Sequence, residues 1–132
     1  IKIDIIDTPG VFEIPATIRK NIKRYEGFIA LGCVIKGKTP HFDFISRSTI
    51  NALMELSVQN KKIIGNGIIT CFNKKQALDR SNNVNNKGSE SAKAAIILPA
   101  INKDKPIKIT FFRPTLSLHI PKGNCRRPCV NP

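Results

Sequence analysis

The sequence predicts an α/β protein in which helices cover both faces of a parallel β-sheet. Its 132 residues, 41% of them hydrophobic, suffice for one domain with a modest core. Apolar runs that read as strands alternate with stretches of helical periodicity, in the order β-α-β-α-β-α-α. Strands separated by helices pair in parallel through right-handed crossovers, so we expect residues 1–98 to form a three-layer α/β/α domain.

The first strand is predicted at the start of the chain, where apolar and polar residues alternate over residues 1–6. The turn residues Thr8-Pro9-Gly10 follow it. Pro15 is compatible with the first turn of a helix. That helix is predicted from the apolar residues that then recur at helical spacing: Ile14, Ile18, Ile22 and Tyr25.

The second strand is predicted at residues 28–34, a mostly apolar run. Asp43 then stands where an N-cap would begin a helix. We expect this helix to end at the pair Lys61-Lys62. Its apolar face consists of Ile45, Thr49, Ala52, Leu53 and Leu56.

The third strand is predicted at residues 63–69, and two helices follow it. Asn73 and Gln76 have the spacing of a capping box ahead of a short helix. The last helix is expected over residues 89–98, because Pro99 would break it.

Residues 99–132 differ from the rest in composition, and we expect them to be an extended or irregular tail. From residue 102 onward this segment has seven Lys or Arg against one Asp, and five of the nine prolines. Such proline content makes a central strand improbable, although residues 107–112 could form an edge strand or an apolar anchor. The net charge of +13 raises the possibility of nucleic-acid binding through this tail. The segment lacks the interleaved aromatic residues of a stacking platform, so we expect no nucleic-acid partner.

The four cysteines predict neither a metal site nor a disulfide framework. Cys33 and Cys71 lie at strand ends, where a small buried thiol is common. Cys125 and Cys129 lack the second pair of ligands that a zinc site needs. No apolar run approaches the length that spans a bilayer, so we expect a cytoplasmic protein without a membrane partner.

Polar residues follow each predicted strand, and the most informative are in residues 32–44, Gly-Cys-Val-Ile-Lys-Gly-Lys-Thr-Pro-His-Phe-Asp-Phe. This basic loop joins a strand to a helix. The carboxyl ends of parallel strands lie at one edge of the sheet, where ligands of open α/β folds bind. We therefore expect a ligand site that combines this loop with residues 8–15 and with the segment after the third strand.

These blocks resemble the 6,7-dimethyl-8-ribityllumazine synthase family. The similarity rests on Thr-Pro-Gly-Val-Phe-Glu-Ile-Pro at residues 8–15, on Ala-Leu followed by the loop above at residues 30–44, and on Asn-Gly-Ile-Ile-Thr at residues 66–70. Gln-Ala-Leu-Asp-Arg at 76–80 and Asn-Lys-Gly at 86–88 extend it. The blocks occur in the family's order between about residues 3 and 97.

The resemblance implies a flavodoxin-like fold and a transferase of riboflavin biosynthesis. Family members condense 5-amino-6-(D-ribitylamino)uracil with 3,4-dihydroxy-2-butanone 4-phosphate, and they use no cofactor or metal. They form homo-oligomers based on pentamers, with active sites between neighbouring chains.

The resemblance also implies residue roles. Val11, Phe12 and Glu13 would meet the ribityl chain, and Cys33, Val34 and Ile35 would offer main-chain groups to the pyrimidine. The phosphate would be held by Lys38 and Thr39, by Arg80, and by Lys87 as a secondary cation, the last two facing the adjacent chain. His41 would transfer protons, which suits an imidazole near neutral pH. Asn66 replaces a phenylalanine that is frequent at its position in the family.

Two differences from the family lead to further expectations. Family chains carry a strand, a helix and a loop with a stacking aromatic residue ahead of the first strand seen here, so we expect a truncated and unstable chain. Their ends do not resemble residues 99–132, which suggests a frameshift or misjoined end. The alternatives are a non-catalytic flavin or lumazine binder of the same fold, an inactive fragment, and, less favoured, a basic nucleic-acid binder.

Overall fold

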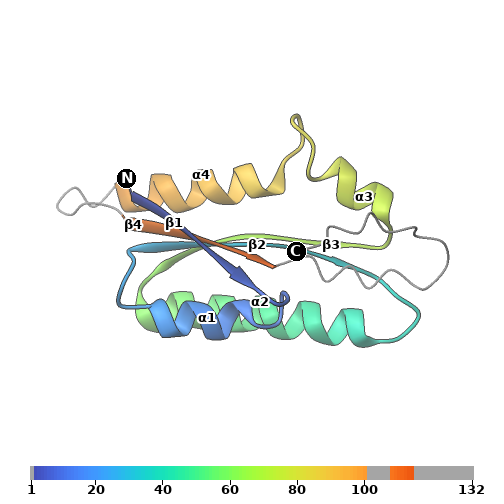
Figure 1. Ribbon diagram of the computed structural model, residues 1–132, viewed down its shortest axis with the longest axis horizontal. Coiled ribbons are helices and arrows are strands. Elements are labelled where there is room, and N and C mark those ends of the chain that lie inside the picture. The colour runs from blue at the N-terminus through green and yellow to red at the C-terminus, as the bar shows by residue number, and fades with distance from the viewer. Residues whose placement is uncertain (1, 101–107, 115–132) are drawn as a thin grey trace, which may run out of the picture.

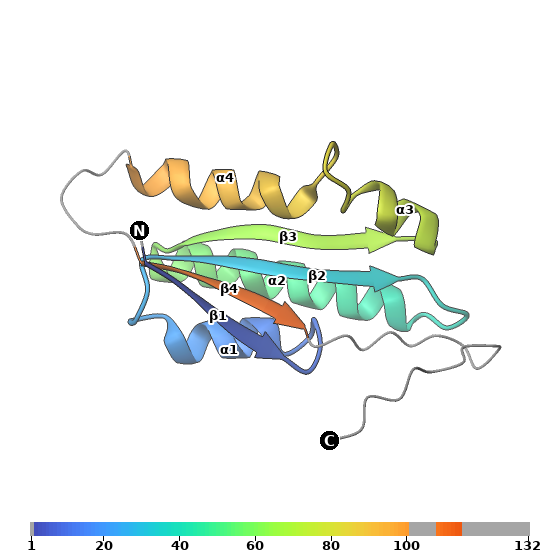
Figure 2. The same ribbon diagram turned by 45° about the horizontal axis from the view of Figure 1, so that its top comes forward.

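The computed structural model describes residues 2–100 and 108–114 and confirms the parallel sheet with helices on both faces (Figure 1). In this part of the chain the strands are β1 (Lys2–Thr8), β2 (Gly27–Ile35), β3 (Ile63–Cys71) and β4 (Lys108–Pro114). The helices are α1 (Ile14–Asn21), α2 (His41–Asn60), α3 (Lys74–Asp79) and α4 (Lys87–Ala100). Helices α1 and α2 lie on one side of the sheet, and α3 and α4 on the other (Figures 1 and 2).

The strand order is β1-β4-β2-β3, with every pairing parallel. The expectation that a strand near residues 107–112 would lie at an edge is therefore wrong, because β4 lies between β1 and β2. The prolines do not prevent this, since Pro106 precedes the strand and Pro114 is its last residue. The rest of the expected tail, with Cys125 and Cys129, lies outside the described residues.

β4 also removes the physical reason for expecting the chain to be unstable. An unpaired inner edge of β1 was the physical reason for expecting it. In the structure, β4 pairs with β1 along its whole length, from Lys2↔Lys108 to Thr8↔Pro114. The main-chain groups on this side of β1 are thus satisfied within the sheet.

Helix boundaries follow local sequence signals with three corrections. α2 begins at His41 with Pro40 as its N-cap, so Asp43 lies in the first turn and is not the cap. α1 ends at Asn21, although Ile22 and Tyr25 remain buried as its apolar spacing predicts. α4 runs from Lys87 to Ala100 rather than over 89–98, so Pro99 lies within the helix, one residue before its end.

Other predicted helix ends are confirmed. The side chain of Asn73 accepts a hydrogen bond from the Gln76 amide (2.9 Å), as a capping residue does. Lys61 ends α2 in the left-handed conformation, with φ of 51°.

The core has one layer on each side of the sheet. The larger layer lies between the sheet and helices α1 and α2, and its buried residues include Ile14, Ile18, Phe28, Leu53 and Ile68. The smaller one lies under α4 and is formed by Ile29 and Ala95, with Leu31, Ile63, Ala92 and Ile96 packed around them. Both faces of β2 are therefore covered, which is typical of a parallel sheet.

Candidate active site

The candidate site lies at the edge of the sheet where the strands end, as the sequence predicts. The loop after β1 leads into α1, and the loop after β2 leads into α2 (Figure 2). α3 follows closely after β3. The polar residues of interest therefore belong to three neighbouring connections.

The first loop is held by the side chain of Thr8, which is 2% exposed and donates a hydrogen bond to the Gly10 carbonyl (3.1 Å). The Glu13 carboxylate lies back over Gly10, since a β-carbon there would be 2.9 Å from Oε2. Phe12 is exposed, whereas Val11 is buried in the core. Phe12 and Glu13 can thus present side chains to a ligand, and the side chain of Val11 cannot.

The main chain of β2 offers hydrogen-bonding groups beyond the point where β4 pairs with it. The β2–β4 ladder of the described residues ends at Ala30↔Phe112, while β2 pairs with β3 as far as Ile35↔Cys71. The Lys36 amide donates to the Cys71 carbonyl of β3 (2.8 Å). At the end of β2, the even-numbered residues therefore direct their amides and carbonyls towards β3. Alternate residues point the other way. The amides and carbonyls of Cys33 and Ile35 therefore face the side that β4 leaves open, and those of Val34 face β3.

The second loop, residues 36–40, contains two lysines in different settings. The ammonium of Lys36 lies 5.9 Å from the ring centre of Phe42 and 5.5 Å from that of Phe72. Lys38, Thr39 and His41 are exposed, and no hydrogen bond or ion pair engages their side chains within residues 2–100 and 108–114. These three residues precede or begin a 20-residue helix, whose first turn favours an anion.

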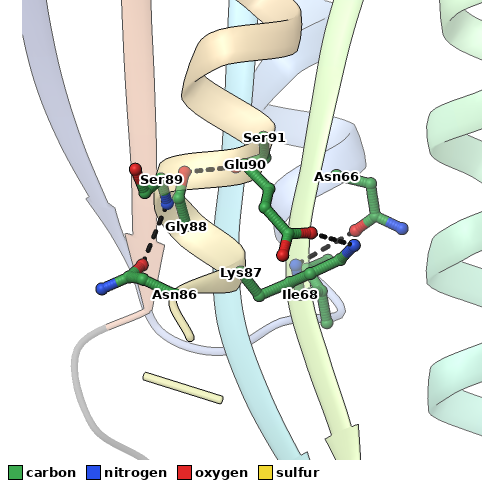
Figure 3. Close-up of polar contacts among 8 residues, drawn as sticks. All are labelled: Asn66, Ile68, Asn86, Lys87, Gly88, Ser89, Glu90 and Ser91. Atoms are coloured by element: carbon green, nitrogen blue, oxygen red, sulfur yellow. Dashed lines mark hydrogen bonds and ion pairs between the residues drawn. The ribbon is translucent and has the colours of Figure 1, made fainter. Parts of the chain in front are cut away.

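The third group of residues lies around the start of α4. Figure 3 shows the Lys87 ammonium paired with the Glu90 carboxylate at 2.8 Å. That hydrogen bond and the charge of Lys87 lower the pKa of Glu90. The Arg80 carbonyl accepts a hydrogen bond from the Lys87 amide (2.9 Å), which joins the end of α3 to the start of α4. The Asn86 side chain caps α4 by accepting from the Ser89 amide (2.9 Å; Figure 3).

Asn66 stands apart from these cations. Its side-chain oxygen accepts a hydrogen bond from the Ile68 amide (3.1 Å) and lies on the opposite face of β3 from the start of α4 (Figure 3). The residue is exposed on β3, an edge strand of the described sheet. Its side-chain nitrogen has no hydrogen-bond partner among the residues that the structure describes and can contact a ligand or another chain.

The structure gathers the predicted residues into two sets. The first comprises Phe12, Glu13, the ends of β2, and residues 38–41, on the connections into α1 and α2. The second comprises Arg80 and Lys87, on the connections around α3 and α4. Asn66, on the other face of β3, belongs to neither set. Among the described residues, no hydrogen bond or ion pair joins the side chains of one set to those of the other.

Sequence reasoning missed the aromatic pair beneath Lys36. Phe42 and Phe72 have ring centres 6.2 Å apart and come from different connections. The position of Phe72 directly after a strand was the signal that could have identified it. Cys33 also differs from expectation: it is exposed, while Cys71 is buried as predicted. Partial burial, followed by the nearby Cys71, raises the pKa of the Cys33 thiol.

The described residues form neither a metal-binding cluster nor a membrane-spanning helix. No cluster of three or more His, Cys, Asp or Glu is arranged to hold a metal ion there. None of the helices in that part of the chain has the length and apolar character to cross a membrane.

Comparison with known proteins gives a consistent result. A family profile described as 6,7-dimethyl-8-ribityllumazine synthase matches residues 1–103. The enzyme of that name from Bartonella tribocorum is 43% identical over 104 residues, covering 76% of this chain and 69% of the relative. That from Afipia carboxidovorans is 44% identical over 108 residues, covering 76% and 66%. A more distant relative from Corynebacterium kroppenstedtii is 38% identical over 98 residues, covering 72% and 62%. The chain spans about two thirds of the length of these curated relatives.

Proposed function

Because this chain belongs to the 6,7-dimethyl-8-ribityllumazine synthase family, we propose that it catalyses the condensation that gives the family its name. The substrates are 5-amino-6-(D-ribitylamino)uracil and 3,4-dihydroxy-2-butanone 4-phosphate. The products are the lumazine, inorganic phosphate and water, and the reaction is a transferase step of riboflavin biosynthesis. The named relatives and the matching profile support this function.

The uracil substrate would bind along the loop after β1 and the end of β2. The Glu13 carboxylate can accept hydrogen bonds from ribityl hydroxyls, and the exposed Phe12 ring offers an apolar face beside them. The main-chain amides and carbonyls of Cys33 and Ile35 supply both donors and acceptors, as a pyrimidine edge requires. Val11 and Val34 would contribute by holding the backbone that carries these contacting groups in place, not by contacting the substrate themselves.

The phosphate of the second substrate would bind at the start of α2. Lys38 supplies charge, Thr39 supplies a hydroxyl donor, and the first amides of the helix are directed at the anion. Arg80 and Lys87 would add cations from a neighbouring chain of a homo-oligomer. We propose a pentamer-based assembly in the cytoplasm, in which each site combines the first set of residues of one chain with the second set of the next.

His41 would transfer the protons of the reaction. The amine of the uracil substrate attacks the ketone and expels water, and phosphate leaves after a carbon-bound proton is removed. The ribityl-bearing nitrogen then attacks the remaining carbonyl, which closes the ring and expels a second water. Each step needs an acid, a base or both. His41 follows the proposed phosphate-binding residues in the chain, its side chain is exposed, and an imidazole can act as an acid and as a base.

One observation carries the proposal: the main-chain groups of Cys33 and Ile35 that no described strand pairs lie on the same strand that leads into Lys38, Thr39 and His41. One strand and its loop can therefore hold the pyrimidine, the phosphate and the proton-transfer group in sequence.

The test is a condensation assay on the full chain at a concentration where sedimentation shows its assembly. With both substrates we expect equal amounts of inorganic phosphate and of the lumazine chromophore. Each substrate alone serves as the control for background phosphate release. Lumazine binding without phosphate release would contradict the proposal and support the non-catalytic binder.

A further inference from the structure

We infer that β4 is a spacer strand that sets the gap between the two substrate loops, and that Thr110 is the positioning residue that fixes its register. This inference rests on the proposed function, because it concerns how two substrates meet. The loop after β1 and the loop after β2 are not on adjacent strands. With β4 between them, the two strands are held about 10 Å apart, twice the usual spacing.

The two ladders of β4 have unequal length. β4 pairs with β1 over its full length, seven positions, but with β2 over only four, from Gly27↔Ile109 to Ala30↔Phe112. The three strands are therefore joined only along the amino-terminal half of β2, opposite the middle of β4 and of β1. Towards the candidate site, β4 stays with β1, and β2 continues with β3.

Thr110 lies at the centre of the joined region. It is fully buried, and its hydroxyl donates a hydrogen bond to the Asp4 carbonyl at 2.8 Å. Asp4 is also its partner in the ladder. A shift of one residue along the strand would turn the Thr110 side chain to the other face and move the end of β4 by about 3.3 Å.

A second contact ties this anchor to β2. The hydroxyl of Tyr25, just before β2, donates to the Asp4 carboxylate at 2.9 Å. The Tyr25 ring packs edge-on against Phe28 of β2, with ring centres 5.9 Å apart. β1, β4 and the start of β2 thus share one buried cluster: Asp4, Thr110, Tyr25 and Phe28.

In the proposed site the uracil substrate spans both strands, from the loop after β1 to the end of β2, whereas the butanone phosphate binds at the loop after β2 alone. Phe12 and Glu13 follow β1, whereas Lys38 and His41 follow β2. Loosening the anchor would leave each loop intact and change their relative position. Small errors of alignment steeply reduce the rate of a reaction between two bound molecules.

The experiment compares Thr110→Val, which keeps the shape of the side chain and removes its hydroxyl, with Thr110→Ser, which keeps the hydroxyl. Ser57→Ala is the matched control. It removes a hydroxyl-to-carbonyl bond to Lys62 (2.7 Å) at the end of α2, away from the site. For each full-length variant we would measure kcat, KM for both substrates, and hydrogen exchange of the β1 amides.

We expect Thr110→Val to lower kcat about tenfold or more, to raise KM for the uracil substrate, which spans β1 and β2, and to leave KM for the butanone phosphate nearly unchanged. Thr110→Ser should reverse most of both effects. Exchange of the β1 amides should accelerate roughly fivefold to tenfold in Thr110→Val and stay unchanged in Ser57→Ala. An unchanged kcat in Thr110→Val, or an equal fall in Ser57→Ala, would overturn the positioning role. Failure of the proposed function is distinguishable, because the wild-type chain would then show no turnover. Even in that case, an unchanged rate of hydrogen exchange of the β1 amides in Thr110→Val would refute the proposal that Thr110 anchors β4 to β1.

Discussion

Gly65 of β3 lies directly against the main chain of Ser91 in α4, with no room for a side chain between them. A β-carbon at position 65 would overlap the Ser91 carbonyl oxygen and lie 3.4 Å from the Ala95 β-carbon. At Gly67, a β-carbon would be 2.6 Å from the Ser91 hydroxyl and 2.7 Å from Leu31 Cδ2. The two glycines let α4 pack closely on the sheet, and this contact sets the position of Lys87 one turn earlier.

Gly65→Ala should therefore destabilise the fold. The obstructing atom belongs to the helix backbone, which cannot turn aside as a side chain does. We expect the free energy of unfolding to fall by about 1–3 kcal/mol, as for overpacked cores, measured by urea denaturation. Gly37→Ala is the matched control, since nothing lies within 4 Å of a β-carbon there. Equal stability of the two variants would show that α4 moves away without cost.

Replacement of His41 tests the proton-transfer role. His41→Ala should lower kcat by about 10²–10⁴-fold, the usual contribution of general acid–base catalysis. The side chain is exposed, so the unfolding free energy should change by less than about 0.5 kcal/mol. Steady-state assays and thermal melting of the same sample check both expectations. A variant that keeps its kcat would remove His41 from the chemistry.

Lys38 and Lys36 are close in sequence but should respond differently to substitution. Lys38→Met should raise KM for the butanone phosphate roughly tenfold to a hundredfold, because a charged hydrogen bond to phosphate is lost. Its effect on stability should be small.

Lys36→Met serves as the comparison. This variant loses the contacts of the ammonium with Phe42 and Phe72, each of which is worth about 0.5–1 kcal/mol at an exposed site. We expect lower stability and little change in KM. Assays against varied butanone phosphate, together with urea denaturation, distinguish the two residues, and the reverse pattern would assign the phosphate to Lys36.

Sequence periodicity predicts most of the fold, because most strands and helices carry their own pattern of apolar residues. The alternation over β1, the apolar run of β2 and the helical spacing of α1 and α2 all reflect burial against the sheet. The place of β4 has no such signal. It depends on pairing with Asp4 across a separation of 106 residues, and a high local proline content argued against an inner strand.

The candidate site was predictable to a similar extent. Strand ends identify the loops, since parallel strands end at one edge. The division of the residues into two sets depends instead on where each strand lies in the sheet and on which face α3 and α4 pack. The direction of the main chain at Cys33 and Ile35 likewise follows from the register with β3, which no local pattern specifies.

The ionisation of Tyr25 tests the buried cluster at the base of the sheet. Burial, and then the hydrogen bond to Asp4, raise the pKa of Tyr25 above its ordinary value of 10.0. A raised pKa in the folded state means that the stabilisation is complete below the pKa of the unfolded chain and is lost as the pH rises through that of the folded protein. Stability should therefore decline above about pH 10.

This tyrosine is the only one in the sequence, and there is no tryptophan, so tyrosinate absorbance reports on it directly. We expect the absorbance to appear only above the ordinary value of 10.0, together with loss of the circular dichroism of the fold. Asp4→Asn should lower the midpoint towards the ordinary value, because it removes the carboxylate that accepts from the hydroxyl. Asp43→Asn, in the first turn of α2, should leave it unchanged. Titration of the folded protein at the ordinary value would show that Tyr25 is open to solvent and that the cluster does not hold β1 against the start of β2.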